Sequence, residues 1–216
     1  MSSFDLVLRT EGSLHPGGEP DRFVSEHAGV LRRIRDRDGR VFNVGLVKAY
    51  RIHAAQAEEA GEVLFDVCDG HSQQLHEVYA ALFDPHTDDL KEEVRARFDV
   101  FDSDILVLDY VLLSPRWRGL KLGLMAARKM LDLLGGGCGL AVCWAYPLNP
   151  DAGEFSKVPA GWVPRHPGEH EQKEARRKLR RHFRRLGFRR VAKTRFDALP
   201  LSRRTPTLED IVRPGS

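Results

Sequence analysis

The segment at 114–124, SPRWRGLKLGL, has the residue types and spacing of a phosphate-binding turn. It links an apolar run at 104–113, which predicts a strand buried on both faces, to a helical apolar stripe at 119–134. The first backbone N–H groups of a helix lack intrahelical partners and lie at the positive end of the helix dipole, so they can hold a phosphate. Gly119 and Gly123 let a ligand approach the backbone closely because they have no side chain. Taken alone, the same glycines also fit tight packing of a helix against a sheet.

The elements that must position this turn alternate between strands and helices. Apolar periodicity predicts, in chain order, strands at 4–9, 27–35 and 41–53, helices at 72–84 and 88–98, the strand at 104–113, the helix at 119–134, a strand at 139–145, a basic helix at 172–186, and short strands at 188–193 and 195–201. Asp38-Gly39 is a hairpin signal, and residues from Leu201 onward are expected to be loosely ordered. This order predicts one α/β (α+β) domain over 1–216, with a mixed, partly parallel sheet flanked by helices and an N-terminal β-hairpin.

Composition sets limits on the class of protein. The chain has 216 residues, and its 34 Lys and Arg residues nearly balance its 31 Asp and Glu residues, so a net charge of +3 predicts no general attraction to nucleic acid. Three cysteines, Cys68, Cys138 and Cys143, lack metal-type spacing and fit free thiols in a reducing cytoplasm. We find no signal peptide and no apolar run long enough for a membrane helix. We therefore expect a cytoplasmic protein without a membrane partner, and the sequence leaves a homodimer open.

The turn and the basic helix together resemble two motifs of the GNAT superfamily of N-acetyltransferases. Pro115, Arg118 and Gly123 match motif A, in which a strand runs through apolar-x-Pro into Arg/Gln-x-x-Gly-x-Gly/Ala. Leu186-Gly187-Phe188 matches the end of motif B, in which a helix ends in Tyr-Glu-Lys-Leu-Gly-Phe. The two motifs occur in the order that the family has.

The resemblance covers about residues 104–200 and implies acetyl-CoA as co-substrate, whereas 1–100 is divergent because its hairpin precedes its helices. The strand ending at Leu113 is implied to splay from the strand at 139–145, with the pantetheine arm in the gap. Backbone amides of the turn are implied to hold the pyrophosphate, and the amide near Leu113 to polarise the thioester. The implied acetyl-CoA-binding residues are Leu112, Leu113, Arg118, Gly119, Leu120, Lys121, Leu122, Gly123, Leu124 and Arg176. We expect an N-acetyltransferase whose acceptor, a small molecule, a peptide or a protein, the sequence leaves open.

Three positions depart from the motifs. Lys121 stands where motif A has its first glycine, and Arg176 where an asparagine is common. Phe183 stands where many members have a tyrosine that acts as general acid, so Tyr146 or a bound water is left to protonate the leaving thiolate. These departures keep a catalytically silent acyl-CoA-binding module open as an alternative.

Asp109 is the candidate general base. It lies on the strand at 104–113, four residues before Leu113, and strict alternation of side chains puts both residues on one face. A carboxylate desolvated in an apolar strand holds a proton more strongly, which suits a base near neutral pH. In many relatives an acidic residue occupies this place. The alternative is a structural carboxylate bonded to the backbone or to an arginine.

Two further segments carry charge or polar groups. The basic run at 176–185 fits a solvated helix face, contacts with CoA phosphates, or a nucleic-acid-binding stripe reaching 190. A nucleic-acid-binding protein is therefore the alternative from a different class, although we do not expect nucleic acid as the partner. The irregular stretch at 147–171, with Glu154, Trp162 and His166, is expected to line the acceptor site. The histidine spacings match no metal-binding helix, so no metal is expected.

Overall fold

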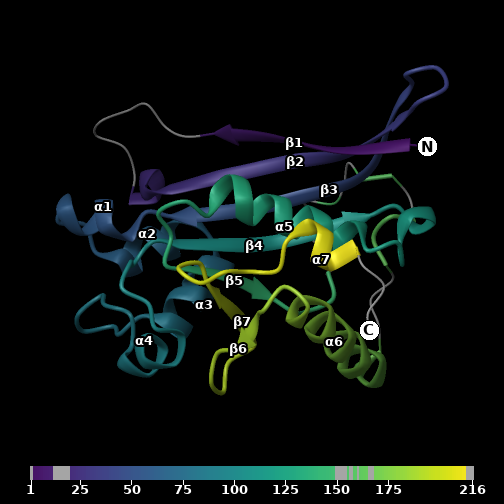
Figure 1. Cartoon of the computed structure of the whole chain (residues 1–216). Coiled ribbons are helices and arrows are strands. Elements are labelled where there is room, and N and C mark those ends of the chain that lie inside the picture. Colours follow the sequence, from purple (N-terminus) through teal and green to yellow (C-terminus); the bar gives the residue numbers. More distant parts are fainter. Residues whose placement is uncertain are drawn as a thin grey trace.

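The computed structural model describes residues 2–11, 20–148, 155, 158–159, 161–164 and 168–212. Within them one seven-stranded sheet has the order β1-β2-β3-β4-β5-β7-β6 (Figure 1). The strands are β1 (Ser2–Glu11), β2 (Val24–Arg35), β3 (Val41–Ile52), β4 (Ile105–Leu113), β5 (Leu140–Trp144), β6 (Arg189–Arg190) and β7 (Phe196–Pro200). β4 and β5 run parallel, and the other neighbouring pairs run antiparallel. The α+β class and the partly parallel sheet are confirmed.

Helices connect the strands and cover the sheet on both faces (Figure 1). Four short helices lie between β3 and β4, α5 connects the parallel pair β4 and β5, and α6 precedes β6. Their bounds are α1 (Ala54–Glu59), α2 (Leu64–His71), α3 (Gln73–Leu82), α4 (Glu92–Phe98), α5 (Leu122–Leu134), α6 (Glu169–Arg184) and α7 (Leu208–Val212), with short 3₁₀ turns η1 (Pro20–Phe23) and η2 (Pro115–Trp117). No helix in the described ranges has the length and apolar character needed to cross a membrane.

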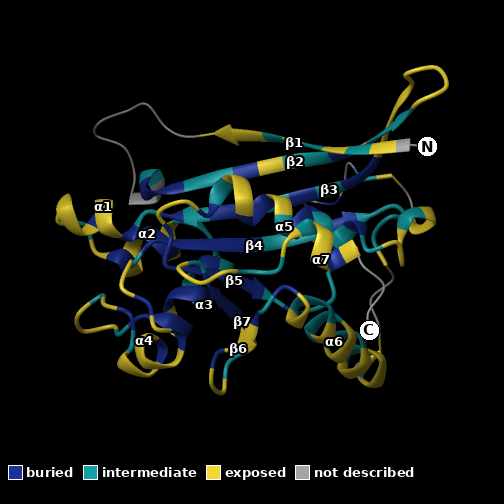
Figure 2. Ribbon diagram, in the orientation of Figure 1, coloured by how far each residue is buried: buried dark blue, intermediate teal, exposed yellow. Residues whose placement is uncertain are grey.

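Two apolar clusters, one on each face of the central strands, hold the layers together (Figure 2). Successive side chains of a strand point to opposite faces. In β4, Ile105 and Val107 join the cluster that contains α2, α3 and α4, whereas Leu106 and Leu108 join the cluster under α5. β4 is thus buried on both faces, as its apolar run predicts.

Some element boundaries differ from the expectations. The helix expected at 119–134 begins at Leu122, because the chain passes through η2 and a left-handed residue first. The helix expected at 88–98 begins at Glu92, since Asp88 has a left-handed φ of 55° and lies outside the helix. The tail expected to be loose contains α7, whose Ile211 packs into the cluster under α5 and is only 2% exposed.

His27 on β2 is a buried histidine that the fold holds in its neutral form. It is 6% exposed, and its Nδ1 lies 2.9 Å from Thr10 Oγ1. Burial lowers the pKa of His27, and the charges of His53 and Arg51 lower it further. The unfolded chain therefore binds this proton more tightly than the folded chain. The resulting stability is present above the ordinary histidine pKa and is lost as the pH falls through the folded-state pKa.

We expect the urea midpoint of the wild type to fall between about pH 7.5 and about pH 5.5, and to fall less steeply in His27→Gln, which takes up no proton. One histidine accounts for at most about 1.4 kcal/mol per pH unit. Urea titrations of both proteins across this range measure the two slopes. Equal slopes would show that His27 titrates alike in the folded and unfolded chains.

Candidate functional site

The parallel strands β4 and β5 part before β4 ends. Their pairing runs from Ile105 opposite Leu140 to Leu108 opposite Cys143. β5 ends one residue later, whereas β4 continues to Leu113 alongside β3. Within the described residues, the second half of β4 has no strand partner on its β5 side. Backbone N–H and C=O groups on an unpaired edge need another partner.

The first turn of α5 lies beside this end of β4. Gly119 and Lys121 have φ of 78° and 60°, so the chain turns sharply from η2 into the helix through two left-handed residues. Lys121 is the N-cap residue, and no side chain caps the helix. The carbonyl of Lys121 accepts the amide of Met125 at 3.1 Å, so the first-turn amides at 122–124 precede the intrahelical bonds and point outward.

Gly123 faces both the end of β4 and α6. A Cβ at this position would lie 3.6 Å from His182 Nε2, 3.8 Å from Leu113 Cδ1 and 3.9 Å from Val111 Cγ1, which are ordinary contacts. Burial lowers the pKa of His182, and the charge of Arg185 lowers it further, so the imidazole is neutral at pH 7. Three elements therefore meet at the positive end of α5 without a carboxylate among these contacts.

The long side chains of the turn are engaged with the protein. Arg118 Nε donates to the Leu113 carbonyl at 3.0 Å, and its Nη2 donates to the carbonyl of Trp162. Lys121 Nζ donates to the Val212 carbonyl of α7 at 3.2 Å. Arg118 therefore links the turn to β4 by a hydrogen bond, and Lys121 links it in the same way to α7.

Most leucine side chains of the turn and of the end of β4 are buried, so only the backbone groups of these residues are left to contact a ligand. Leu112, Leu122 and Leu124 are buried, and Leu113 is half-buried in the cluster under α5. Leu120, by contrast, is 55% exposed. A Cβ added at the preceding residue, Gly119, would meet no atom within 4 Å. The space next to the turn is thus open at Gly119.

Asp109 lies in a β-bulge of β4. Across the ladder from β3, Lys48 pairs with Tyr110 and Ala49 with Leu108, so Asp109 is the additional residue. An extra residue shifts the alternation of side chains by one position. Residues beyond the bulge, among them Leu113, therefore lie on the face opposite to the one that strict alternation from Asp109 predicts.

Asp109 faces α3, on the same side of the sheet as Ile105 and Val107. Gln74 Nε2 donates to its Oδ1 at 2.9 Å, whereas Leu113 and Val111 pack against the cluster under α5, on the other face. The expectation that Asp109 and Leu113 share a face is wrong, because the bulge lies between them.

The surroundings of Asp109 are polar, not apolar as the sequence suggested. The residue is half-buried and accepts the Gln74 amide. Burial by itself lowers the pKa of Lys48. A hydrogen bond with Tyr50 and the negative charges of Glu26 and Asp109 outweigh burial, so the pKa of Lys48 is raised above its ordinary value. A charged ammonium thus lies within electrostatic range of the Asp109 carboxylate.

Tyr146 and Arg176, which the sequence assigned to different roles, lie together. The Tyr146 hydroxyl donates to Gln172 Oε1 at 2.9 Å, and the Arg176 guanidinium lies 4.0 Å from the centre of the Tyr146 ring. Gln172, Arg176 and Arg180 are spaced four residues apart and share one face of α6.

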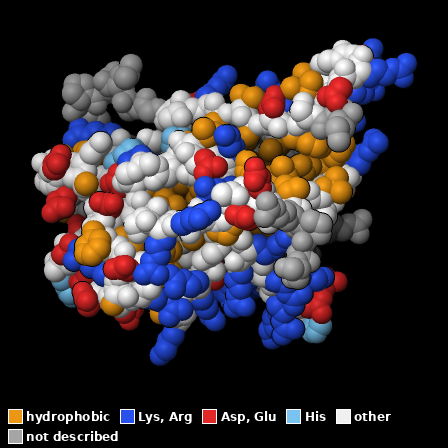
Figure 3. All heavy atoms as spheres, viewed as in Figure 1, with side chains coloured by type: hydrophobic (Ala, Val, Ile, Leu, Met, Phe, Trp, Pro, Cys, Tyr) orange, Lys and Arg blue, Asp and Glu red, His pale blue; other side chains and the backbone are white. Residues whose placement is uncertain are grey.

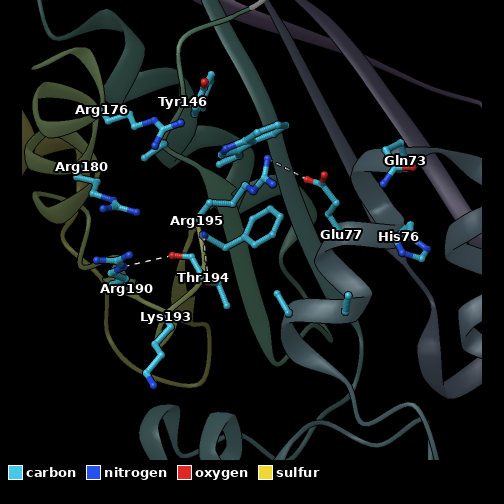
Figure 4. Close-up of a pocket in the computed structure, with 15 residues that line it drawn as sticks. Gln73, His76, Glu77, Tyr146, Arg176, Arg180, Arg190, Lys193, Thr194 and Arg195 are labelled. Atoms are coloured by element: carbon cyan, nitrogen blue, oxygen red, sulfur yellow. Dashed lines mark hydrogen bonds and ion pairs between the residues drawn. The ribbon is translucent and has the colours of Figure 1, made fainter. Parts of the chain in front are cut away.

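A pocket of about 570 Å³ opens at the end of β5, between α3 on one side and α6 with the β6–β7 loop on the other (Figure 4). Tyr146 and Trp144 line it, as do Gln73, His76 and Glu77 of α3. Its cationic lining residues are Arg176, Arg180, Arg190, Lys193 and Arg195. In the view of Figure 3, Lys and Arg side chains gather at the lower side, over α6 and the β6–β7 region.

Sequence reasoning missed the contribution of α3 and of the β6–β7 loop. The loop residues Arg190, Lys193 and Arg195 closely follow the Leu-Gly-Phe at the end of the basic helix. Their positive charge, so near the basic helix, was a signal in the sequence that this loop adds to the same cationic surface. Gln74 and Glu77 carried no such signal, because they are ordinary polar residues of an amphipathic helix. Only the packing of α3 under β4 and β5 places them here.

The remaining expectations fall partly outside the described residues. Glu154 and His166 of the 147–171 stretch lie there, whereas Trp162 is described and its carbonyl accepts Arg118. The part of the chain that the structure describes holds no group of three or more His, Cys, Asp or Glu placed for a metal ion. Burial raises the pKa of Cys143 well above its ordinary value, so it is a buried thiol.

Comparison of the chain with family models, with curated proteins and with solved structures found no match.

Proposed function

We propose that this chain is an N-acetyltransferase that moves an acetyl group from acetyl-CoA to an amine acceptor. The observation that carries the proposal is the parting of β4 and β5 after Leu108 and Cys143, directly beside the uncapped first turn of α5. The turn that leads into this helix carries the resemblance to motif A of the GNAT superfamily, through Pro115, Arg118 and Gly123, and the resemblance implies such a gap between these strands.

The residues of the turn fit a pyrophosphate. The first-turn amides at 122–124 and the helix dipole favour an anion, and Gly119 and Gly123 keep the approach free of side chains. Lys121 has a φ of 60°, a conformation that favours glycine, at the position where motif A has a glycine. This backbone geometry supports the alignment of Lys121 with that glycine. Beyond Leu108, β4 is no longer paired with β5, and we place the pantetheine arm of acetyl-CoA along that stretch.

The proposed proton transfers use two side chains of this chain. Acetyl-CoA supplies an acetyl thioester. Asp109, positioned by Gln74, takes a proton from the amine directly or through a water. The Tyr146 hydroxyl protonates the leaving thiolate after turning away from Gln172 Oε1. Phe183 takes no part, since its ring packs edge-on against Phe188 at 5.6 Å between centroids.

A catalytically silent acyl-CoA-binding module is the second candidate. It is favoured by Phe183, which occupies the motif B tyrosine position with a ring that donates no proton, and by the Tyr146 hydroxyl already bonded to Gln172. Acetyl-CoA binding without thiol release across a panel of amines would select this candidate. Salt-sensitive binding to oligonucleotides without acetyl-CoA binding would instead select a nucleic-acid-binding protein.

The test of the proposal is a thermal shift with acetyl-CoA. At about 100 times Kd, a ligand that binds only the folded chain adds about 2.7 kcal/mol of stability. For a domain of this size each kcal/mol raises Tm by about 2–4 °C, so we expect a rise of several degrees. CoA should retain most of the rise, because the phosphate contacts are shared. The proposal is wrong if acetyl-CoA, CoA and longer acyl-CoAs all leave Tm unchanged.

A further inference from the structure

The pocket between α3 and α6 concentrates positive charge. Five cationic side chains line it, together with one carboxylate, that of Glu77 (Figure 4). The whole chain nearly balances 34 basic against 31 acidic residues, so overall composition does not explain this excess. Like charges around one cavity repel each other, and a bound anion relieves that repulsion.

The protein neutralises only part of this charge. Arg195 Nη1 lies 3.5 Å from Glu77 Oε2, and Arg180 Nε lies 3.2 Å from Asp197 Oδ2. The other three cations, Arg176, Arg190 and Lys193, form no ion pair within the described part of the chain. Arg176 and Lys193 therefore have no carboxylate partner among the described residues, and Arg190 interacts with Asp197 only at longer range, so these charges can meet a ligand.

Two buried donors also lack a partner in this pocket. Arg176 Nε and Trp144 Nε1 are buried and make no hydrogen bond to any described residue. An unsatisfied buried donor costs about 1–3 kcal/mol, so it commonly marks a bound water or ligand. Arginine forks match carboxylate and phosphate oxygens in geometry. A ligand rich in anionic oxygens would satisfy both the charge and the donors.

The pocket adjoins the place where β4 and β5 part. Trp144, which lines it, directly follows Cys143, the last β5 residue paired with β4. On the other side Gln73 lines the pocket, and its neighbour Gln74 donates to Asp109. Asp109, the proposed base, thus lies on the same side of the sheet as the pocket.

We infer that this pocket holds the acceptor, and that the acceptor is a small amine carrying at least two negative charges on phosphate or carboxylate groups. The inference rests on the proposed function and names its substrate class. Three cations without an ion pair in the described ranges match two or more negative charges, and the Glu77 carboxylate in the pocket suits the ammonium end of the same molecule.

The test uses two triple variants that remove the same charge. The pocket variant is R176Q/R190Q/K193Q, which removes the unpaired cations and leaves the Glu77 and Asp197 pairs intact. The control variant is K173Q/R177Q/K178Q, which changes exposed residues of α6. The probes are O-phosphoserine and serine, which share an amine and differ by the phosphate. Calorimetry measures binding of O-phosphoserine with and without saturating acetyl-CoA, and thiol release measures transfer.

We expect the wild type and the control variant to bind O-phosphoserine at least about tenfold more tightly than serine, and the pocket variant to lose that preference. Acetyl-CoA affinity should stay within about twofold in all three proteins, because Arg176, which the motif resemblance assigned to acetyl-CoA, lines this pocket and not the turn at 118–124. Thiol release should follow the same order.

Three results would overturn the inference. Equal losses in the pocket and control variants would indicate a long-range charge effect, as expected of a nucleic-acid-binding surface. A parallel loss of acetyl-CoA affinity in the pocket variant would assign the pocket to CoA. Equal binding of O-phosphoserine and serine by the wild type would exclude an anion site. If acetyl-CoA fails to bind while O-phosphoserine binding still depends on the pocket residues, the transferase proposal is wrong and the anion pocket stands.

Discussion

Gly123→Asp is expected to abolish the stabilisation of this protein by acetyl-CoA. The new carboxylate would enter the space bounded by Leu113, Val111 and His182 and would repel a pyrophosphate at the first turn of α5. At about 100 times the wild-type Kd, the expected loss is the whole ligand contribution of about 2.7 kcal/mol. Differential scanning fluorimetry with and without acetyl-CoA measures it.

The same substitution should leave the unliganded fold intact. A Cβ at position 123 makes only ordinary contacts, and an acidic residue in the first turn of a helix is favourable by about 0.3–1 kcal/mol. We therefore expect the unliganded Tm to be unchanged or slightly higher. Gly123→Ala is the matched control, because it adds the Cβ without the charge and should keep most of the shift. If acetyl-CoA raises the Tm of Gly123→Asp as much as that of the wild type, the turn is not part of the acetyl-CoA site.

Asp109→Asn is expected to lower turnover by about 10²- to 10⁴-fold, the usual contribution of general base catalysis. Asparagine keeps the shape of the side chain and an oxygen that can accept the Gln74 amide, so the bulge should persist. The kcat of both proteins, measured with an acceptor from the anionic amine series, checks this expectation.

The control for this prediction is acetyl-CoA binding. Asp109 faces α3 and not the first turn of α5, so Asp109→Asn should keep the wild-type thermal shift. A folded variant that binds acetyl-CoA and turns over at the wild-type rate across the pH range would make Asp109 a structural carboxylate. Loss of the shift together with turnover would show that the bulge supports the ligand site.

The sequence by itself determined the elements whose signals are local. The apolar run at 104–113 and the stripe that ends at Leu134 predicted β4 and α5, because burial on a strand or a helix repeats within a few residues. The start of the helix expected at 72–84 also has a local signal, because Ser72 Oγ accepts the Leu75 amide at 3.3 Å and caps α3. Asp38-Gly39 likewise predicted the turn between β2 and β3. Each of these depends on neighbours in the chain.

Only the tertiary structure decided the orientation of Asp109 and the composition of the basic pocket. The bulge exists in the pairing of β4 with β3, whose residues are distant in sequence, so alternation within β4 alone put Leu113 on the same face as Asp109, which is wrong. The pocket joins α3 to α6 and the β6–β7 loop across the sheet, and Glu77 meets Arg195 only there. α7 is short and acidic, and it is held by Ile211 against the cluster under α5. Contacts between segments that are remote in sequence leave no periodic pattern in the chain. These features could therefore be identified only from the tertiary structure.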